Sequence, residues 1–196
     1  MENCLSLLKK NLSDSIQAKQ LLLEDEQMQA EFVTAAEMVL KKYLTGGRLY
    51  IMGNGGSAAD AQHLAAEFVS KLAADRDPLP AEALTVDTSI LTAIGNDYGY
   101  DELFARQIIG KVNKDDCVLA ISTSGNSKNI LKGLKTCSER GISTLLFTGS
   151  DGGKAKPLAD FCIIAPGNHT GTIQEIHIVL AHTLCGYIEN RIFDHP

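Results

Sequence analysis

The sequence contains no apolar run close to the roughly 18 residues that a membrane-spanning helix needs. Its N-terminus has neither a basic segment nor a small-residue cleavage site. These absences predict a cytoplasmic protein that binds no membrane. Basic residues are also too few for a general anion-binding surface, because 18 Lys and Arg stand against 24 Asp and Glu and the net charge is −6. Nucleic acid is therefore not an expected partner, and any anionic ligand must be held locally.

Cysteine is scarce and scattered, with no C-x-x-C pair among Cys4, Cys117, Cys137, Cys162 and Cys185. Several of them lie in apolar runs, so we expect reduced core residues rather than disulfides. Linkers, low-complexity segments and tandem repeats are likewise absent from the sequence. With 196 residues, of which 44% are apolar and 21% charged, residues 1–196 are predicted to form a single domain.

Two amphipathic helices are predicted before the first strand. Apolar residues recur every three or four positions over 5–16 and again over 32–43, with an acidic break at 24–26 and a glycine stop at Gly46. Helices with no sheet of their own must bury their apolar faces against the domain or against another subunit. We expect residues 1–45 to be a helical extension that mediates oligomerisation.

From residue 49 onward, short apolar runs alternate with helical patterns, which is typical of βαβ units and a parallel sheet. The predicted strands are 49–52, 83–86, 118–121, 144–147 and 161–164. The predicted helices are 58–74, 89–95, 101–111, 127–140 and 172–192. The sequence thus indicates the α/β class with five strands.

Two turns rich in glycine and hydroxyl groups follow the first and third strands: Gly53-Asn54-Gly55-Gly56-Ser57 and Ser122-Thr123-Ser124-Gly125-Asn126-Ser127. Backbone N–H groups, hydroxyls and a helix N-terminus can together hold a phosphate without any lysine. The alternative is that Ser57 and Ser127 only cap helices. For the second turn we favour phosphate binding, because its three serines and one threonine exceed what a cap needs. The first turn lacks both the P-loop lysine and the G-x-G-x-x-G pattern, which disfavours a nucleotide.

His63 and Glu67 stand four residues apart in the helix after the first turn and so share one face of it. An imidazole and a carboxylate at this spacing can share a metal ion. The alternative is a surface ion pair, and a partner elsewhere in the chain would favour the metal.

The last predicted helix contains polar residues in an otherwise apolar stretch, and buried polar groups need partners. At about 100° per residue, Glu175 and His182 nearly superimpose, whereas Gln174 lies about 80° from His182. Spacing alone therefore favours Glu175 as the companion of His182. The other histidines, His169, His177 and His195, are interpreted as structural, solvent-facing or part of a frayed tail.

Two weaker candidates remain. Gly95-Asn96-Asp97 follows an apolar helical stretch, and its amide and carboxylate could contact a polyol or simply form a turn. Lys71, one turn beyond Glu67, could pair with that carboxylate or reach a ligand.

In this order, the two turns, His63-x-x-x-Glu67, Gly95-Asn96-Asp97 and Ile173-Gln174-Glu175 with His182 resemble the phosphoheptose isomerases, the sedoheptulose 7-phosphate isomerase family of the sugar isomerase (SIS) domain. The resemblance extends over nearly the whole chain. It implies a flavodoxin-like three-layer α/β sandwich around a five-stranded parallel sheet, and a homotetramer. The chain departs from the family pattern at Gly171 and Thr172, where many members have charged residues.

The resemblance also implies one zinc ion per subunit, held by His63, Glu67, Gln174 and His182 between elements of neighbouring subunits. Gln174 then takes the place that spacing assigns to Glu175. Glu67 and His182 are the implied catalytic base and acid. The implied substrate contacts are Asn54, Gly55, Gly56, Ser57, Glu67, Asn96, Asp97, Ser122, Thr123, Ser124, Ser127 and Gln174.

The implied reaction converts D-sedoheptulose 7-phosphate to D-glycero-D-manno-heptose 7-phosphate through an enediol, supplying heptose for a bacterial surface polysaccharide. Such proton transfer needs a base near the carbon and a proton donor near the oxygen. One alternative is a non-enzymatic SIS protein that binds a phosphosugar or acts as a scaffold in regulating replication initiation. Relatives of that kind lack residues matching Glu67 and His182, so their presence here favours the enzyme. A five- or six-carbon sugar phosphate is the other substrate left open.

Overall fold

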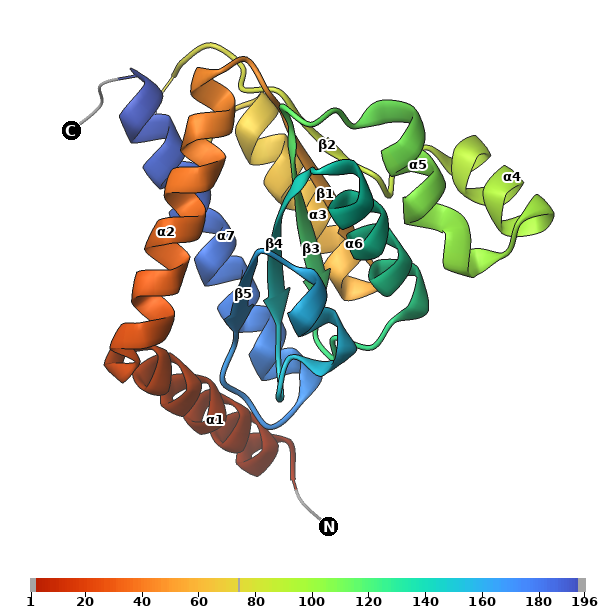
Figure 1. Cartoon of the computed structure of the whole chain (residues 1–196). Helices are drawn as coiled ribbons and strands as arrows, with labels where there is room; N and C mark the ends of the chain where they lie inside the picture. The colour runs from red at the N-terminus through yellow and green to blue at the C-terminus, as the bar shows by residue number, and fades with distance from the viewer. Residues whose placement is uncertain (1–2, 74, 194–196) are drawn as a thin grey trace.

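The computed structural model describes residues 3–73 and 75–193, and it begins with two helices, α1 (Cys4–Glu24) and α2 (Glu26–Leu44) (Figure 1). Asp25 separates them, and its side chain accepts a hydrogen bond from Met28 N at 2.9 Å as the N-cap of α2. The acidic break thus ends one helix and starts the next, as the sequence predicts. The predicted tail residue His195 lies outside the described residues.

The five strands form one parallel sheet in the order β2-β1-β3-β4-β5. Their bounds are Leu49–Gly53 for β1, Ala81–Ala83 for β2, Cys117–Ser122 for β3, Ser143–Thr148 for β4 and Phe161–Ile164 for β5. The predicted α/β class with a five-stranded parallel sheet is confirmed. The prediction for the second strand, 83–86, is displaced: pairing starts at Ala81, opposite Leu49. The apolar run in the sequence continues past Ala83, the last residue of β2 that pairs with β1, and Val86 at the end of this run is exposed.

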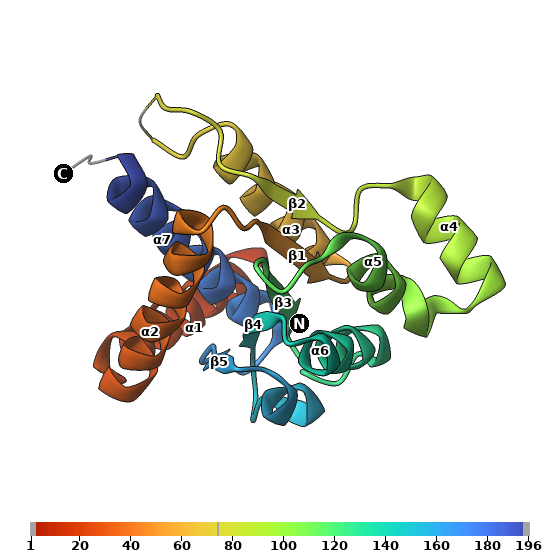
Figure 2. The same ribbon diagram turned by 45° about the horizontal axis from the view of Figure 1, so that its top comes forward.

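Helices cover both faces of the sheet and make three layers (Figures 1 and 2). On one face, α2, α3 (Gly56–Val69) and α7 (Thr170–Phe193) pack on Leu49 and Ile51 of β1. On the other face, α5 (Leu103–Lys111) and α6 (Lys128–Arg140) pack on Tyr50 and Met52. This alternation follows from the two-residue period of a strand. Helix α4 (Thr88–Asp97) stands out beyond α5 (Figure 2).

Several helix ends differ from the prediction. Helix α3 starts at Gly56 and ends at Val69, earlier than the predicted end at 74, a residue outside the described ones. The chain leaves the helix at Ser70 and turns back, which lets Leu79 N donate to Phe68 O at 3.0 Å. The predicted helix 101–111 is a 3₁₀ turn, Tyr100–Glu102, followed by α5. A second 3₁₀ segment spans Gly153–Leu158.

Strand order reverses between β1 and β3, and ligands of open α/β sheets bind at such a point, outside the carboxyl ends of the strands. The turns after β1 and β3 lead into α3 and α6, which lie on opposite faces of the sheet. The fold therefore brings the two predicted phosphate turns to neighbouring positions on one edge.

The cysteines are free, and all are buried except Cys4, which is exposed on α1. The expectation of core cysteines is thus wrong for Cys4. Burial raises the pKa of Cys162 to about 11 and of Cys117 to about 12, so these thiols stay protonated. Within the described residues, no helix has both the length and the apolar character needed to cross a bilayer.

Candidate functional site

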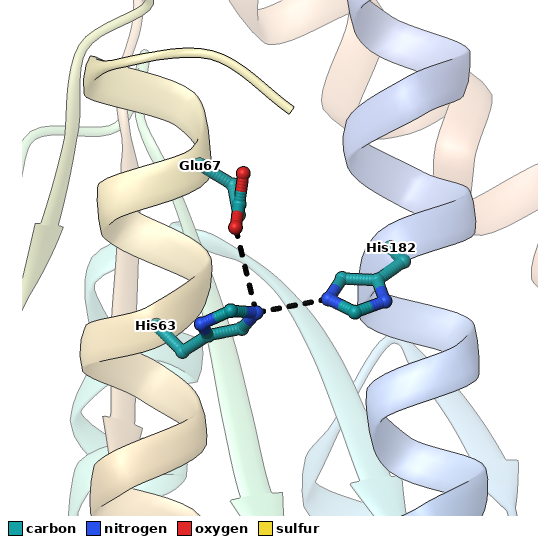
Figure 3. Close-up of side chains that lie close together, drawn as sticks. All are labelled: His63, Glu67 and His182. Atoms are coloured by element: carbon teal, nitrogen blue, oxygen red, sulfur yellow. Dashed lines mark hydrogen bonds and ion pairs between the residues drawn. The ribbon is translucent and has the colours of Figure 1, made fainter. Parts of the chain in front are cut away.

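His63 and Glu67 of α3 and His182 of α7 form a compact cluster (Figure 3). His63 Nε2 lies 2.9 Å from His182 Nε2 and 3.5 Å from Glu67 Oε1. The two rings meet at 60° with their centroids 5.2 Å apart. The cluster is open to solvent on one side, because the His63 side chain is 47% exposed whereas that of Glu67 is 21% exposed. The pair predicted from spacing on α3 thus has a partner on α7.

This donor set fits a divalent metal. One ligand atom from each of the three residues lies within 4.8 Å of the others, and all three come from the same chain. Two imidazoles and one carboxylate are among the ligand sets of catalytic zinc sites, which keep a further position for substrate. Tetrahedral zinc with Zn–N bonds of about 2.0–2.1 Å places two nitrogens about 3.3 Å apart, so the histidines would separate slightly to bind it. These three ligands therefore need no neighbouring subunit.

Gln174 lies elsewhere, against the first glycine turn. A Cβ placed on Gly56 would be 2.2 Å from Gln174 Nε2, which shows how closely the amide rests on this glycine. Gln174 precedes His182 by eight residues on α7, a rise of about 12 Å. In the structure, the side-chain amide of Gln174 therefore lies beside the first glycine turn and not beside His63 and His182.

The first turn does not use Ser57 as a helix cap. The N-cap of α3 is Gly55, with φ +56°, and no side chain bonds the first N–H groups of the helix. Ser57 lies inside the first turn of α3 and is buried. The capping alternative is thus wrong for Ser57, and the N-terminal N–H groups have no side-chain acceptor.

The second turn likewise ends at a helix whose N-cap residue makes no side-chain hydrogen bond. Ser127 occupies the N-cap position of α6, but its side chain makes no capping hydrogen bond. Within the turn, Asn126 N donates to Ser124 Oγ at 3.2 Å and Asn126 Nδ2 donates to Ser124 O at 2.7 Å. Gly125 has φ +60°, and a Cβ on it would lie 2.1 Å from Gly152 O, so only glycine fits there.

Two residues that sequence reasoning missed connect these turns. Asn129 at the start of α6 is buried and exchanges hydrogen bonds with Asn54, Nδ2 to Oδ1 in both directions, at 2.9 and 2.8 Å. Tyr100 Oη also donates to Asn54 Oδ1 at 3.0 Å. The side-chain amide of Asn54 is therefore held by Asn129 of α6 and by Tyr100. Neither residue stands in a recognisable motif, so only their proximity in the fold identifies them.

The geometry agrees with comparisons to known proteins. Residues 14–149 match the SIS domain family. The chain is 48% identical over 193 residues to phosphoheptose isomerase 2 of Campylobacter jejuni, covering 98% of this chain and 96% of that relative. The structure of the phosphoheptose isomerase from Neisseria gonorrhoeae, 39% identical, superposes with a TM-score of 0.89 over 96% of this chain and all of that one. This chain belongs to the phosphoheptose isomerase family.

A second solved phosphoheptose isomerase, from Francisella tularensis, is 32% identical and has a TM-score of 0.90, with 96% of this chain and 100% of that chain covered. The resemblance inferred from the ordered motifs is thus confirmed, and with it the SIS fold and the expectation of an isomerase.

Two residues expected as substrate contacts lie apart from the cluster. Asn96 and Asp97 lie in the last turn of α4, both exposed, with Asn96 Nδ2 donating to Asp97 Oδ1 at 2.8 Å. The projecting position of α4 keeps them away from α7 (Figure 2). Lys71 pairs with Asp75 at 3.5 Å instead of Glu67.

The angular preference for Glu175 is wrong, because Glu175 faces α1. It accepts hydrogen bonds from Ser15 Oγ and from Lys19 Nζ, the latter at 3.4 Å. His177 is structural, as expected: it is buried and its Nε2 bonds Thr148 O at 2.9 Å. Burial lowers the pKa of His177 to about 4, so the ring stays neutral.

Proposed function

We propose that this protein converts D-sedoheptulose 7-phosphate to D-glycero-D-manno-heptose 7-phosphate, and so supplies heptose for a bacterial surface polysaccharide. The observation that supports it most is the His63, Glu67 and His182 cluster, which combines a carboxylate with imidazoles beside a phosphate-binding edge. The names of the similar proteins agree with this substrate. The scaffold alternative has no need of such a cluster.

The phosphate is assigned to the second turn, with Ser122, Thr123, Ser124 and Ser127 supplying hydroxyls. Helices α1, α2 and α4 each have an Asn or Asp at the N-cap whose side chain accepts from a first-turn N–H, whereas Gly55 and Ser127, the N-cap residues of α3 and α6, make no such hydrogen bond. Helix α5 also lacks a side-chain cap, but it continues the 3₁₀ turn Tyr100–Glu102. Helices α3 and α6 instead each follow a glycine turn. Their free N–H groups and positive dipole ends can accept an anion. Asn54, Gly55, Gly56 and Gln174 would then contact the sugar hydroxyls.

Proton transfer is assigned to Glu67 and His182. Glu67 takes a proton from C1 of the ketose while His182 donates one to the C2 carbonyl oxygen, which gives the enediol. The O1 hydroxyl proton then passes to His182, which restores its protonated form, and Glu67 delivers a proton to C2, which forms the aldose. Gly56 and His63 are about 10 Å apart along α3, so an extended sugar can place hydroxyls at the first glycine turn and its reacting carbons at the cluster.

A zinc ion, one per subunit, is the proposed cofactor. His63, Glu67 and His182 would hold it. Gln174 is the proposed fourth ligand when its amide turns away from Gly56, and in its position against Gly56 it would contact the sugar instead. When bound, zinc polarises the oxygens of the sugar. The protein's own residues orient the substrate and move the protons, for which Glu67 and His182 would exchange or share their bonds to the metal.

Deuterium incorporation tests the proposal. In deuterated water with sedoheptulose 7-phosphate, the protein should form an aldoheptose phosphate carrying deuterium at C2. Glu67→Gln and His182→Gln should each lower kcat by about 10² to 10⁴ with little change in phosphate affinity. Glu175→Gln is the matched control, because that carboxylate faces α1. Failure of the zinc-loaded wild-type protein to interconvert any ketose and aldose phosphate would refute the proposed function.

A homotetramer built partly by residues 1–45 is the proposed assembly. Leu5, Leu8, Leu12 and Ile16 of α1 are all more than half exposed, although they form the apolar stripe of that helix. An apolar groove of about 600 Å³ between α1, α2 and α7 adjoins it. Light scattering should give a tetramer for the wild-type chain and smaller species for the double variant L8E/L12E. A folded wild-type monomer would contradict this assembly.

A further inference from the structure

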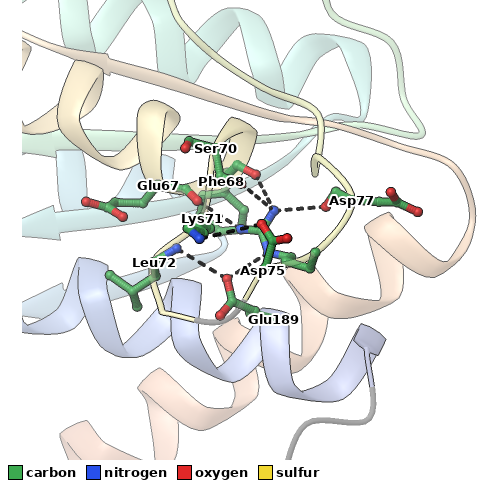
Figure 4. A network of polar contacts seen from close by, with 9 residues as sticks. Glu67, Phe68, Ser70, Lys71, Leu72, Asp75, Asp77 and Glu189 are labelled. Atoms are coloured by element: carbon green, nitrogen blue, oxygen red, sulfur yellow. Dashed lines mark hydrogen bonds and ion pairs between the residues drawn. The ribbon is translucent and has the colours of Figure 1, made fainter.

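A buried ion pair lies outside the His63, Glu67 and His182 cluster but joins the same two helices (Figure 4). Arg76 Nε donates to Glu189 Oε2 at 2.7 Å, and the two side chains are only 1% and 2% exposed. Removing both charges from water is costly unless every contact is well made. The contacts that the pair makes at this position are therefore more informative than its contribution to stability.

The remaining N–H groups of Arg76 hold the end of α3. Its Nη2 donates to Glu67 O at 2.8 Å, and its Nη1 donates to Phe68 O at 2.8 Å and to Ser70 O at 3.4 Å. The last carbonyls of a helix lack partners within the helix, and a cation there also interacts favourably with the helix dipole. Arg76 thus holds the backbone of Glu67, whose carboxylate belongs to the cluster.

The other partner, Glu189, belongs to α7. It follows His182 by seven residues, which places the two on nearly the same side of the helix about 10 Å apart. Glu189 Oε2 also accepts a hydrogen bond from Leu72 N at 3.3 Å, and the Arg76 guanidinium lies 5.6 Å from the centre of the Phe193 ring. The loop after α3 is therefore anchored to the end of α7.

We propose that Arg76 and Glu189 are positioning residues, which set the separation of α3 and α7 and so hold Glu67 and His182 at the distance that metal binding and proton transfer require. The guanidinium suits this task because its planar fork meets several acceptors in fixed directions, which a lysine cannot do. The effect of this pair on turnover rests on the proposed function, whereas the effect of the pair on metal binding does not.

The test uses Arg76→Lys and Glu189→Gln in the full chain. A misplacement of reacting groups by about 1 Å can cost about 100-fold in rate. Each variant should lower kcat by about 10- to 100-fold while KM, governed by the distant phosphate turn, stays within about twofold. The Kd for cobalt(II), followed by visible absorption in metal-stripped protein, should rise by about 10-fold or more, as for other residues that orient metal ligands.

Two controls separate positioning from a loss of stability. Arg191→Lys makes the same change on α7, two residues from Glu189, at a side chain that is 57% exposed. Ile108→Ala removes a buried side chain from α5 on the opposite face of the sheet. Arg191→Lys should leave every parameter unchanged. Ile108→Ala should lower the unfolding temperature and leave kcat and cobalt affinity unchanged.

The proposal is overturned if Arg76→Lys and Glu189→Gln lower the unfolding temperature as Ile108→Ala does but keep kcat and cobalt affinity within twofold of wild type. Glu189→Gln, which preserves the shape of the side chain, supplies the test if Arg76→Lys does not fold. Weakened cobalt binding in a protein whose wild type has no isomerase activity would support the positioning role and refute the proposed function separately.

Discussion

Replacing Gly56 by alanine should damage the site by displacing Gln174, which itself is unchanged. The added Cβ would lie 2.2 Å from Gln174 Nε2, and real Cβ atoms essentially never come closer than 3.0 Å, so the amide must move by at least the 0.8 Å difference. Gly56 is the first residue of α3 and is not among the positive-φ glycines, so an alanine is compatible with its backbone. The perturbation therefore displaces the amide and leaves the backbone of Gly56 in place.

The expected loss follows from one hydrogen bond or ligand contact. Leaving one hydrogen-bonding group of the bound sugar without its partner costs about 1 to 3 kcal/mol, which corresponds to about 5- to 150-fold in kcat/KM. Gln174→Ala should show the same loss, and the double variant should lose no more, because both changes remove one interaction. Gly110→Ala on α5 is the matched control: a Cβ there has nothing within 4 Å and should retain full activity.

The assay is conversion of sedoheptulose 7-phosphate at saturating zinc, with thermal unfolding by circular dichroism to show that each variant is folded. Full activity in folded Gly56→Ala would refute the reasoning that Gln174 acts from its position against this glycine. Additive losses in the double variant would refute it too, since the two changes would then remove different interactions.

Three further outcomes are expected. Because burial lowers the folded-state pKa of His177 to about 4 from 6.5, its contribution to stability is fully present above pH 6.5 and is lost as pH falls toward 4. Urea unfolding should show about 2 kcal/mol less loss between pH 7 and 5 in His177→Gln than in wild type, and equal losses would contradict the buried neutral ring. Ser124→Ala should raise KM by about 10- to 100-fold; unchanged sugar-phosphate affinity in this variant and in Ser122→Ala and Ser127→Ala would place the phosphate elsewhere. Elemental analysis after dialysis should find close to one zinc per chain and little in folded His63→Ala, whereas full occupancy in a His63→Ala, His182→Ala variant would exclude both as ligands.

Patterns of short range in the sequence determined much of this structure. The helices α1 and α2, the acidic break at Asp25 and the rhythm of five parallel strands follow from local periodicity and capping, which act within a few residues. The two turns could be placed on one sheet edge because parallel strands bring their carboxyl ends together. The spacing of His63 and Glu67 likewise specified a shared helix face.

Which residues meet across helices was decided only by the tertiary structure. Glu175 and His182 lie on nearly the same side of α7, yet α1 covers the level of Glu175 and α3 the level of His182. Helical periodicity gives a direction around the axis, but the neighbour met in that direction changes along the axis. For the same reason no local pattern indicated that Asn129 would bond Asn54, or that Arg76 would join the end of α3 to Glu189. Those contacts depend on how the chain packs over distances of many residues.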